Sequence, residues 1–195
     1  MKKLKLAIIG SGGHAKSCIE VIEGHKNIEI IGLIDNDPKK KIRKYKVICD
    51  EKNISKLKKI TNNVVLGIGS LNDNSKRINI FNKFKKLGFY FPNIVSKYSF
   101  VSNQSKLGEG TIIFNHVFIN SGSIIGKNCI INNKSLIEHD VIIHDHCHIS
   151  TGVIVNGNCE ICEGSFIGSG SIILNNLKLK KNSFIKIGTV KKNNL

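Results

Sequence analysis

The residues most able to do chemistry lie in one short stretch, IEHDVIIHDHCHIS at positions 137–150. It holds four of the seven histidines in the chain, namely His139, His144, His146 and His148. An imidazole can act as a general base, ligate a metal or decorate a polar surface near neutral pH. The elements that position these side chains decide between a metal site, an acid–base site and a solvated surface.

A six-residue repeat runs through the second half of the chain. In steps of six from Val101 to Ile185, fifteen consecutive positions are aliphatic, and the fourth residue after each is nearly always small or β-branched. This pattern is typical of a β-helix, in which six residues form one side of a triangular coil. The aliphatic residue points inward, and the small residue fills the restricted space near a corner. We expect about five coils, with strands about 4.8 Å apart.

The register of the repeat separates the four histidines. His139 is third in its hexapeptide, His144 second, His146 fourth and His148 sixth. Gly157 follows His139 by one full coil, so the two residues should be stacked on one edge about 5 Å apart. His148 lies half a coil from His139, on another side of the same chain. A single site with both histidines therefore requires a neighbouring subunit.

The cysteines show little sign of a metal or disulfide framework. Of the six, Cys129, Cys147 and Cys159 occupy small-residue positions, which predicts buried thiols, and Cys159-x-x-Cys162 is an isolated pair. The apolar run after the first lysines is too short for a signal peptide or a membrane span. We expect a cytoplasmic protein with reduced thiols and no membrane partner.

The formal charge of +16 is uneven. Residues 1–100 carry a net +13 and residues 101–195 a net +3. The lysines are scattered, aromatic residues are sparse, and the abundance of Asn and Ile is what an AT-rich genome would encode. We therefore expect no nucleic-acid partner and favour small anionic ligands such as nucleotides.

The first half begins with a strand, a glycine loop and a helix, in the segment LKLAIIGSGGHAKSCIEVIEG. Gly10, Gly12 and Gly13 with Ala15 form a G-x-G-x-x-A pattern, which lets backbone amides and a helix N-terminus approach a phosphate. A second strand then ends at the acidic segment 35–37. An alternative remains open, in which the glycines serve only a tight turn.

The remaining space holds about half a Rossmann domain. We expect a third strand in residues 63–70, a second helix in 74–87 and a last strand in 88–95 that leads into the prism. Such a truncated unit suits a mononucleotide better than NAD. The expected organisation is an α/β half-Rossmann domain in residues 1–94 followed by a parallel β-helix in residues 95–195.

The segment GSGGHAK, combined with IEHDVIIHDHCHISTGVIVNG, resembles the NeuD/PglD-like sugar O-/N-acyltransferases across essentially the whole chain. These bacterial enzymes acetylate nucleotide-linked amino sugars or sialic-acid-type sugars with acetyl-coenzyme A. The resemblance implies a left-handed β-helix and a homotrimer with sites between subunits. It also implies a Rossmann-like domain that binds the nucleotide sugar.

The resemblance also implies roles for particular residues. His139 would be the general base, and Asp140 would orient its imidazole. His148 and Gly157 would contact the acetyl-coenzyme A co-substrate near the thioester. The nucleotide of the sugar would be held by the glycine loop and the acidic segment, that is by Gly10, Gly12, Gly13, His14, Asp35, Asn36 and Asp37.

We therefore expect an acetyl-coenzyme A-dependent N-acetyltransferase of a UDP-linked 4-amino sugar in bacterial glycan biosynthesis. Transfer would need no metal. It would also be direct, because the inward register of Cys147 disfavours an acyl-enzyme. O-acetylation of a sialic-acid-like sugar is the nearest alternative, and a non-catalytic regulatory trimer is another. In this scheme His144 and His146 face solvent or line a groove.

A zinc enzyme of the γ-carbonic-anhydrase kind, with His139 and His144 as ligands, is a more distant alternative. No third histidine lies in phase about two coils upstream of this pair, because His116 is twenty-three residues before His139. That class of enzyme also lacks an amino-terminal glycine-loop domain.

Overall fold

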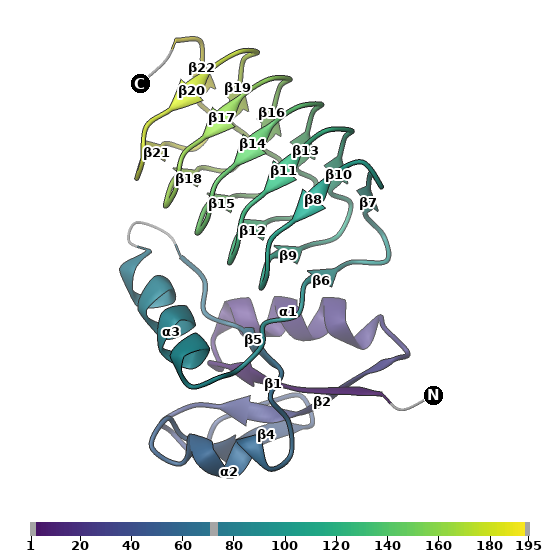
Figure 1. Ribbon diagram of the computed structural model, residues 1–195, viewed down its shortest axis with the longest axis vertical. Helices are drawn as coiled ribbons and strands as arrows, with labels where there is room; N and C mark the ends of the chain where they lie inside the picture. Colours follow the sequence, from purple (N-terminus) through teal and green to yellow (C-terminus); the bar gives the residue numbers. More distant parts are fainter. Residues whose placement is uncertain (1–2, 71–73, 194–195) are drawn as a thin grey trace. The chain divides into compact units, whose positions relative to one another are not determined.

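The computed structural model describes residues 3–70 and 74–193, which form two compact units (Figure 1). The first unit extends to Gly69 and resumes from Ser75 to Pro92. The second contains Ser70, Asn74 and the chain from Asn93 onward. None of the helices in the described ranges is long and apolar enough to cross a membrane.

The first unit is built on a five-stranded sheet with the order β3-β4-β2-β1-β5. All its pairs are parallel except β3 with β4. The strands are β1 (Leu4–Ile9), β2 (Ile28–Ile34), β3 (Lys41–Ile42), β4 (Tyr45–Cys49) and β5 (Val64–Leu66). The helices are α1 (Gly13–Glu23), α2 (Ile54–Lys58) and α3 (Ser75–Lys86).

The sequence predicted β1, α1, β2 and α3 close to these bounds, and the fold class is confirmed. The predicted strand in 63–70 is shorter, since only Val64–Leu66 is a strand. The strand predicted for 88–95 is wrong. Tyr90 forms an isolated bridge with Asn63, and Ile94–Val95 pairs inside the second unit. Pro92 lies between the two and cannot donate a ladder hydrogen bond.

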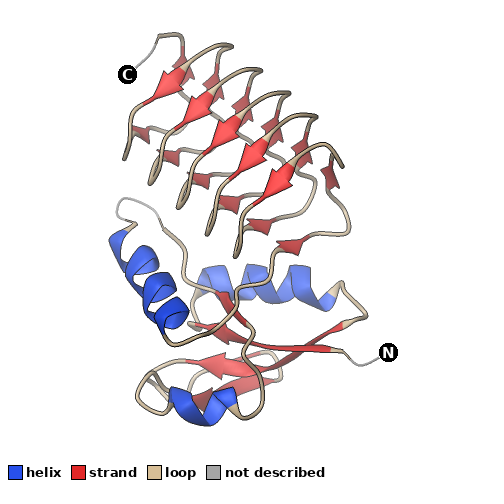
Figure 2. Cartoon of the chain, in the orientation of Figure 1, coloured by secondary structure: helices blue, strands red, loops and turns tan. Residues whose placement is uncertain are grey.

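The second unit is a left-handed β-helix whose short strands form three parallel sheets, as the repeat in Figure 2 shows. One sheet contains β7 (Phe100–Val101), β10 (Phe118–Ile119), β13 (Leu136–Ile137), β16 (Ile154–Val155), β19 (Ile172–Ile173) and β22 (Val190–Lys191). The next contains β8 (Lys106–Leu107), β11 (Ile124–Ile125), β14 (Ile142–Ile143), β17 (Glu160–Ile161) and β20 (Lys178–Leu179). The third contains β6 (Ile94–Val95), β9 (Ile112–Ile113), β12 (Ile130–Ile131), β15 (His148–Ile149), β18 (Phe166–Ile167) and β21 (Phe184–Ile185).

Each inward aliphatic residue pairs with the one eighteen positions away, as Ile119 does with Ile137 and Ile137 with Val155. These side chains form one continuous core, and Cys129, Cys147 and Cys159 are buried within it. Burial raises the pKa of the Cys159 thiol. The triangular prism expected from the repeat is therefore confirmed.

The corners follow a period that the sequence analysis did not identify. Every sixth residue from Gly110 to Gly188 has a positive φ. Gly, Asn and Asp tolerate this conformation best, and they occupy most of these positions. The fourth residue of each hexapeptide therefore turns the chain, and Asp140 and His146 are two of these corner residues.

We predict that Ile149→Ala lowers the free energy of unfolding by about 2–5 kcal/mol, because it empties a fully buried core position. Ile142→Ala is the matched control, since Ile142 is 38% exposed, and it should change stability much less. Urea denaturation followed by circular dichroism measures both. Equal losses in the two variants would contradict the inward register.

Candidate active site

His139 and Asp140 form a hydrogen-bonded pair at the corner that follows β13. The His139 Nδ1 atom lies 2.9 Å from Asp140 Oδ2, and the two side chains are 57% and 66% exposed. Because a carboxylate only accepts, Nδ1–H is the donor in this hydrogen bond. Nε2 then carries the lone pair and is available to take up a proton.

Gly157 lies against the imidazole one coil further along. A Cβ atom on Gly157 would be 2.6 Å from His139 Nε2 and 2.7 Å from Cε1. The backbones are tied together, since Asn158 N–H donates to the His139 carbonyl at 3.0 Å. The structure thus brings His139, Asp140 and Gly157 together, and the absence of a side chain at Gly157 makes room for the ring.

Gly122 lies against the Asp140 side chain one coil earlier, as Gly157 lies against His139. A Cβ atom on Gly122 would collide with Asp140 Oδ1. The Asp140 N–H also donates to the Ser121 carbonyl at 3.0 Å. The sequence analysis did not single out Gly122, although its eighteen-residue distance from Asp140 is the signal that identifies it.

His148 lies in a different sheet, on β15, and is buried. Its Nδ1 atom is 2.5 Å from the Ser70 carbonyl, which makes Nδ1–H the donor. The ring meets Phe166 edge-on, with centroids 5.1 Å apart. Within one chain His148 is therefore on another side from His139, as its register indicates, and its contact with the coenzyme stays a prediction.

His144 and His146 also have separate environments. His144 Nε2 lies 2.9 Å from Glu160 Oε1, and His146 Nδ1 lies 2.9 Å from Asn128 Nδ2. Asn74 Nδ2 donates to the carbonyls of His146 and Gly164, at 3.1 and 2.7 Å. The four histidines of the sequence stretch therefore do not form one cage.

Among the described residues, one cluster of three side chains could hold a metal ion, and it consists of His144, Glu160 and Cys162. Neither His139 nor His148 belongs to this cluster. The γ-carbonic-anhydrase alternative uses His139 and His144 as ligands. Within the chain these two histidines have different hydrogen-bond partners, Asp140 for His139 and Glu160 for His144.

In the first unit, the glycine loop leaves the N-terminus of α1 open. Gly10 has φ of 93°, and Gly12 caps the helix with no side-chain hydrogen bond. A Cβ atom on Gly12 or Gly13 would meet nothing within 4 Å. The first amides of the helix can therefore be reached by an anion such as a phosphate. His14 lies in the first turn and packs near Gly69, whose Cβ would be 3.4 Å from that of His14.

Asp35 connects the glycine loop to the acidic segment. Ser11 Oγ–H donates to Asp35 Oδ2 at 2.5 Å, and Oδ1 accepts from Asp37 N–H at 3.1 Å and Lys40 Nζ at 3.2 Å. Burial acts to raise the pKa of Asp35, but these hydrogen bonds and the Lys40 charge outweigh it and hold the pKa below its ordinary value. Asp35 is therefore a carboxylate at neutral pH.

A cavity of about 270 Å³ opens where β2 and β4 end. Its polar lining comes from Asp35 and Asn36 in one loop, from Asp50 and Asn53 in the other, and from Lys56 in α2. The sequence analysis predicted the first loop. It assigned no element to residues 38–60, so it missed β4 and the Asp50 loop.

The buried Arg77 is another residue that the sequence analysis missed. Its Nη1 donates to the carbonyls of Leu66 and Ile68, at 3.1 and 2.5 Å. These carbonyls flank Gly67, and a Cβ atom on Gly67 would be 2.9 Å from that of Ala15. Arg77 thus holds the segment after β5 against the start of α1.

Comparison with known proteins agrees with both units. The family model of the PglD N-terminal domain matches residues 5–84. A histidine variant of perosamine N-acetyltransferase from Caulobacter crescentus, in complex with CoA and GDP-perosamine, is 26% identical with a TM-score of 0.91. The match covers 98% of this chain and 90% of that one.

The acetyltransferase domain of PglB from Neisseria gonorrhoeae FA1090, in complex with acetyl coenzyme A, is 23% identical with a TM-score of 0.90. That match covers 99% of this chain and 93% of the other, and it shows a common fold. No curated protein matches the chain in sequence.

We predict that Gly157→Ala displaces the His139 imidazole, because the new methyl group would overlap the ring. The ring signals of His139 in a proton–nitrogen NMR spectrum should shift. Gly13→Ala is the control, since a Cβ atom there meets nothing within 4 Å and Gly13 is not among the glycines with a positive φ. Unchanged His139 signals in Gly157→Ala would contradict the stacking.

Proposed function

We propose that this chain, whose resemblance to the NeuD/PglD-like sugar acyltransferases is confirmed by the family model and the structural matches, is a sugar N-acetyltransferase. It would transfer the acetyl group of acetyl-coenzyme A to a nucleotide-linked 4-amino sugar. The observation that carries the proposal is the His139–Asp140 pair with Gly157 against the imidazole.

The pair has the properties that acetyl transfer to an amine requires. Asp140 holds the Nδ1–H tautomer, so Nε2 can remove a proton from the attacking amine. The amine nitrogen forms a bond to the thioester carbon, the C–S bond breaks, and coenzyme A leaves as the thiol. The oxygen of the tetrahedral intermediate needs a hydrogen-bond donor. We assign that role to Gly157 N–H. The alternative donor, His148, would need a proton on Nε2 as well, because its Nδ1–H already donates to the Ser70 carbonyl.

The first unit supports a nucleotide-linked acceptor. The open start of α1 can hold the diphosphate, and the cavity at β2 and β4 can hold the base. Its acidic side chains would accept hydrogen bonds from ring N–H groups, which uracil and guanine both have. We keep UDP as the expected carrier and treat GDP as its competitor, since the perosamine N-acetyltransferase is in complex with GDP-perosamine.

An apolar face of the β-helix supports the proposed homotrimer. The outward residues of the sheet that contains β7 and β22 are all apolar, namely Phe100, Phe118, Leu136, Ile154, Ile172 and Val190. Phe100 and Phe118 stack with centroids 4.7 Å apart while 52% and 40% exposed. A contiguous face of this kind marks an interaction site. We assign it to neighbouring copies, which would bring His148 of one chain toward His139 of the next.

Both proposed substrates are cytoplasmic metabolites, so the reaction would take place in the cytoplasm. The acceptor amine is preferred to the hydroxyl of a sialic-acid-like sugar, because the first unit offers sites for a phosphate and a base. The same base would serve O-acetylation, and the choice of acceptor in the assay distinguishes the two reactions.

We predict that the protein releases thiol from acetyl-coenzyme A when given UDP- or GDP-linked 4-amino sugars. His139→Ala should lower kcat by about 10²–10⁴-fold, since it removes the general base. Asp140→Asn should give a smaller loss. His116→Asn changes an exposed histidine at another corner and serves as the control. An unaltered turnover in His139→Ala would exclude the assigned base. If none of the acceptors gives thiol release above background, the proposed reaction is excluded.

We predict that Phe118→Asp dissociates the trimer, because it places a charge in the apolar face. Ile187→Asp is the control at a residue that is 76% exposed and outside that face. Light scattering coupled to size-exclusion chromatography measures both masses. A Phe118→Asp protein that stays trimeric, or a wild-type protein that is monomeric, would show the assignment of this face to be wrong.

A further inference from the structure

His144, Glu160 and Cys162 form a cluster away from the proposed base, which we call the His144–Glu160–Cys162 cluster. One nitrogen, one oxygen and one sulfur atom of these side chains all lie within 4.8 Å of one another. His144 Nε2 is 2.9 Å from Glu160 Oε1, and Cys162 Sγ is 3.9 Å from the same oxygen. Glu160 and Cys162 are half-buried, and the His144 side chain is 45% exposed.

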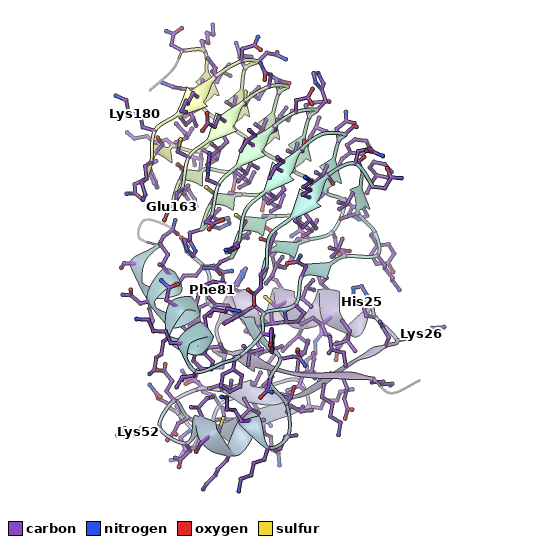
Figure 3. The ribbon with its side chains drawn as sticks, in the orientation of Figure 1. His25, Lys26, Lys52, Phe81, Glu163 and Lys180 are labelled. Carbon is purple, nitrogen blue, oxygen red and sulfur yellow. The ribbon has the colours of Figure 1, made fainter. Side chains whose placement is uncertain are left out.

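The β-helix itself brings these side chains together. His144 and Cys162 directly follow the paired inward residues Ile143 and Ile161, so they occupy the same place in successive coils. Glu160 precedes Ile161 and points outward from β17. Lys180 is next in the column of His144 and Cys162, and Figure 3 shows it at the outer edge of the coils. The cluster is therefore fixed by backbone pairing and open to solvent.

The donor set is that of a zinc-class ion. Zinc takes imidazole nitrogen, carboxylate oxygen and thiolate sulfur at about 2.0–2.3 Å in a tetrahedral arrangement. Ligand atoms around such an ion are a little more than 3 Å apart. The distances of 2.9 and 3.9 Å in the cluster need small side-chain rotations to meet this geometry. His144 donates its Nε2–H to Glu160, so this nitrogen must also give up its proton, with Nδ1 carrying the ring proton instead, to bind the ion.

The neighbouring charge of Lys178 keeps Glu160 ionised and oriented, so that its carboxylate can bind the ion. Lys178 Nζ lies 2.7 Å from Glu160 Oε2, the oxygen that His144 does not contact. This interaction fixes the orientation of the carboxylate in the way that outer partners orient metal ligands. Hydrogen bonds from Lys178 and His144 lower the pKa of Glu160, so it is ionised at neutral pH.

We propose that the His144–Glu160–Cys162 cluster binds one zinc-class divalent cation per chain, with a fourth position left to water. The cluster shares no residue with the proposed acetyl-transfer site of His139, Asp140 and Gly157. Cys162 binds such an ion as the thiolate, so its proton is released when the ion binds.

Cobalt(II) is the probe, because tetrahedral cobalt is coloured and a cobalt–thiolate bond gives a charge-transfer band in the near ultraviolet. Protein stripped with a chelator is titrated with Co²⁺ alone. We expect one Co²⁺ per chain, visible bands of a tetrahedral ion, and loss of the spectrum when Zn²⁺ is added. His139→Ala should give the same spectrum as the wild type.

Three variants remove one ligand each. Cys162→Ser should abolish the charge-transfer band, and His144→Asn and Glu160→Gln should weaken binding at least about tenfold. Cys49→Ser and His116→Asn change one cysteine and one histidine outside the cluster, and both should bind Co²⁺ like the wild type. Circular dichroism confirms that each variant is folded.

The proposal is overturned if the stripped wild-type protein retains no stoichiometric Co²⁺ after gel filtration. It is also overturned if the charge-transfer band persists in folded Cys162→Ser, or if His139→Ala abolishes binding. In that last case the ion belongs to the proposed catalytic site. Failure of acetyl transfer with intact Co²⁺ binding would instead count only against the proposed function.

Discussion

The parallel backbone ladder between coils is the interaction on which the rest of the second unit depends. Ile130 N–H donates to the Cys147 carbonyl at 2.9 Å, and His148 N–H donates to the Ser165 carbonyl at 2.9 Å. Each step moves about eighteen residues along the chain and one strand spacing along the prism. Side chains eighteen residues apart are therefore neighbours, and the ladder converts a spacing in sequence into a contact in space.

The same rule explains how functional groups find room on a crowded corner. The His139 ring lies where Gly157 has no side chain, and the Asp140 carboxylate lies where Gly122 has none. At each of these two positions, a glycine eighteen residues away in the adjacent coil thus provides the space that the reactive side chain occupies. The corner conformation contributes as well, since the positive φ of Asp140 is shared by the fourth residue of every hexapeptide in this region.

Much of this architecture could be predicted from sequence, because one aliphatic residue in six determines the prism and its register. The stacking of His139 with Gly157 followed from that register alone. The His144–Glu160 contact did not, because it joins two adjacent columns and depends on rotamers. In the first unit, Ser11 and Asp35 belong to different loops, and their hydrogen bond depends on how β1 and β2 pair. The strand expected in 88–95 is interrupted at Pro92, which has no N–H for a ladder, so Tyr90 bridges to Asn63 and Ile94–Val95 pairs with β9.

A crystal structure with coenzyme A and the acceptor amino sugar tests the role of His139 most directly. We expect the acceptor nitrogen within about 3.2 Å of His139 Nε2, the reach of a general base. The sulfur of the coenzyme should lie beside Gly157. An acceptor nitrogen bound away from this imidazole, against any other side chain, would contradict the proposed mechanism.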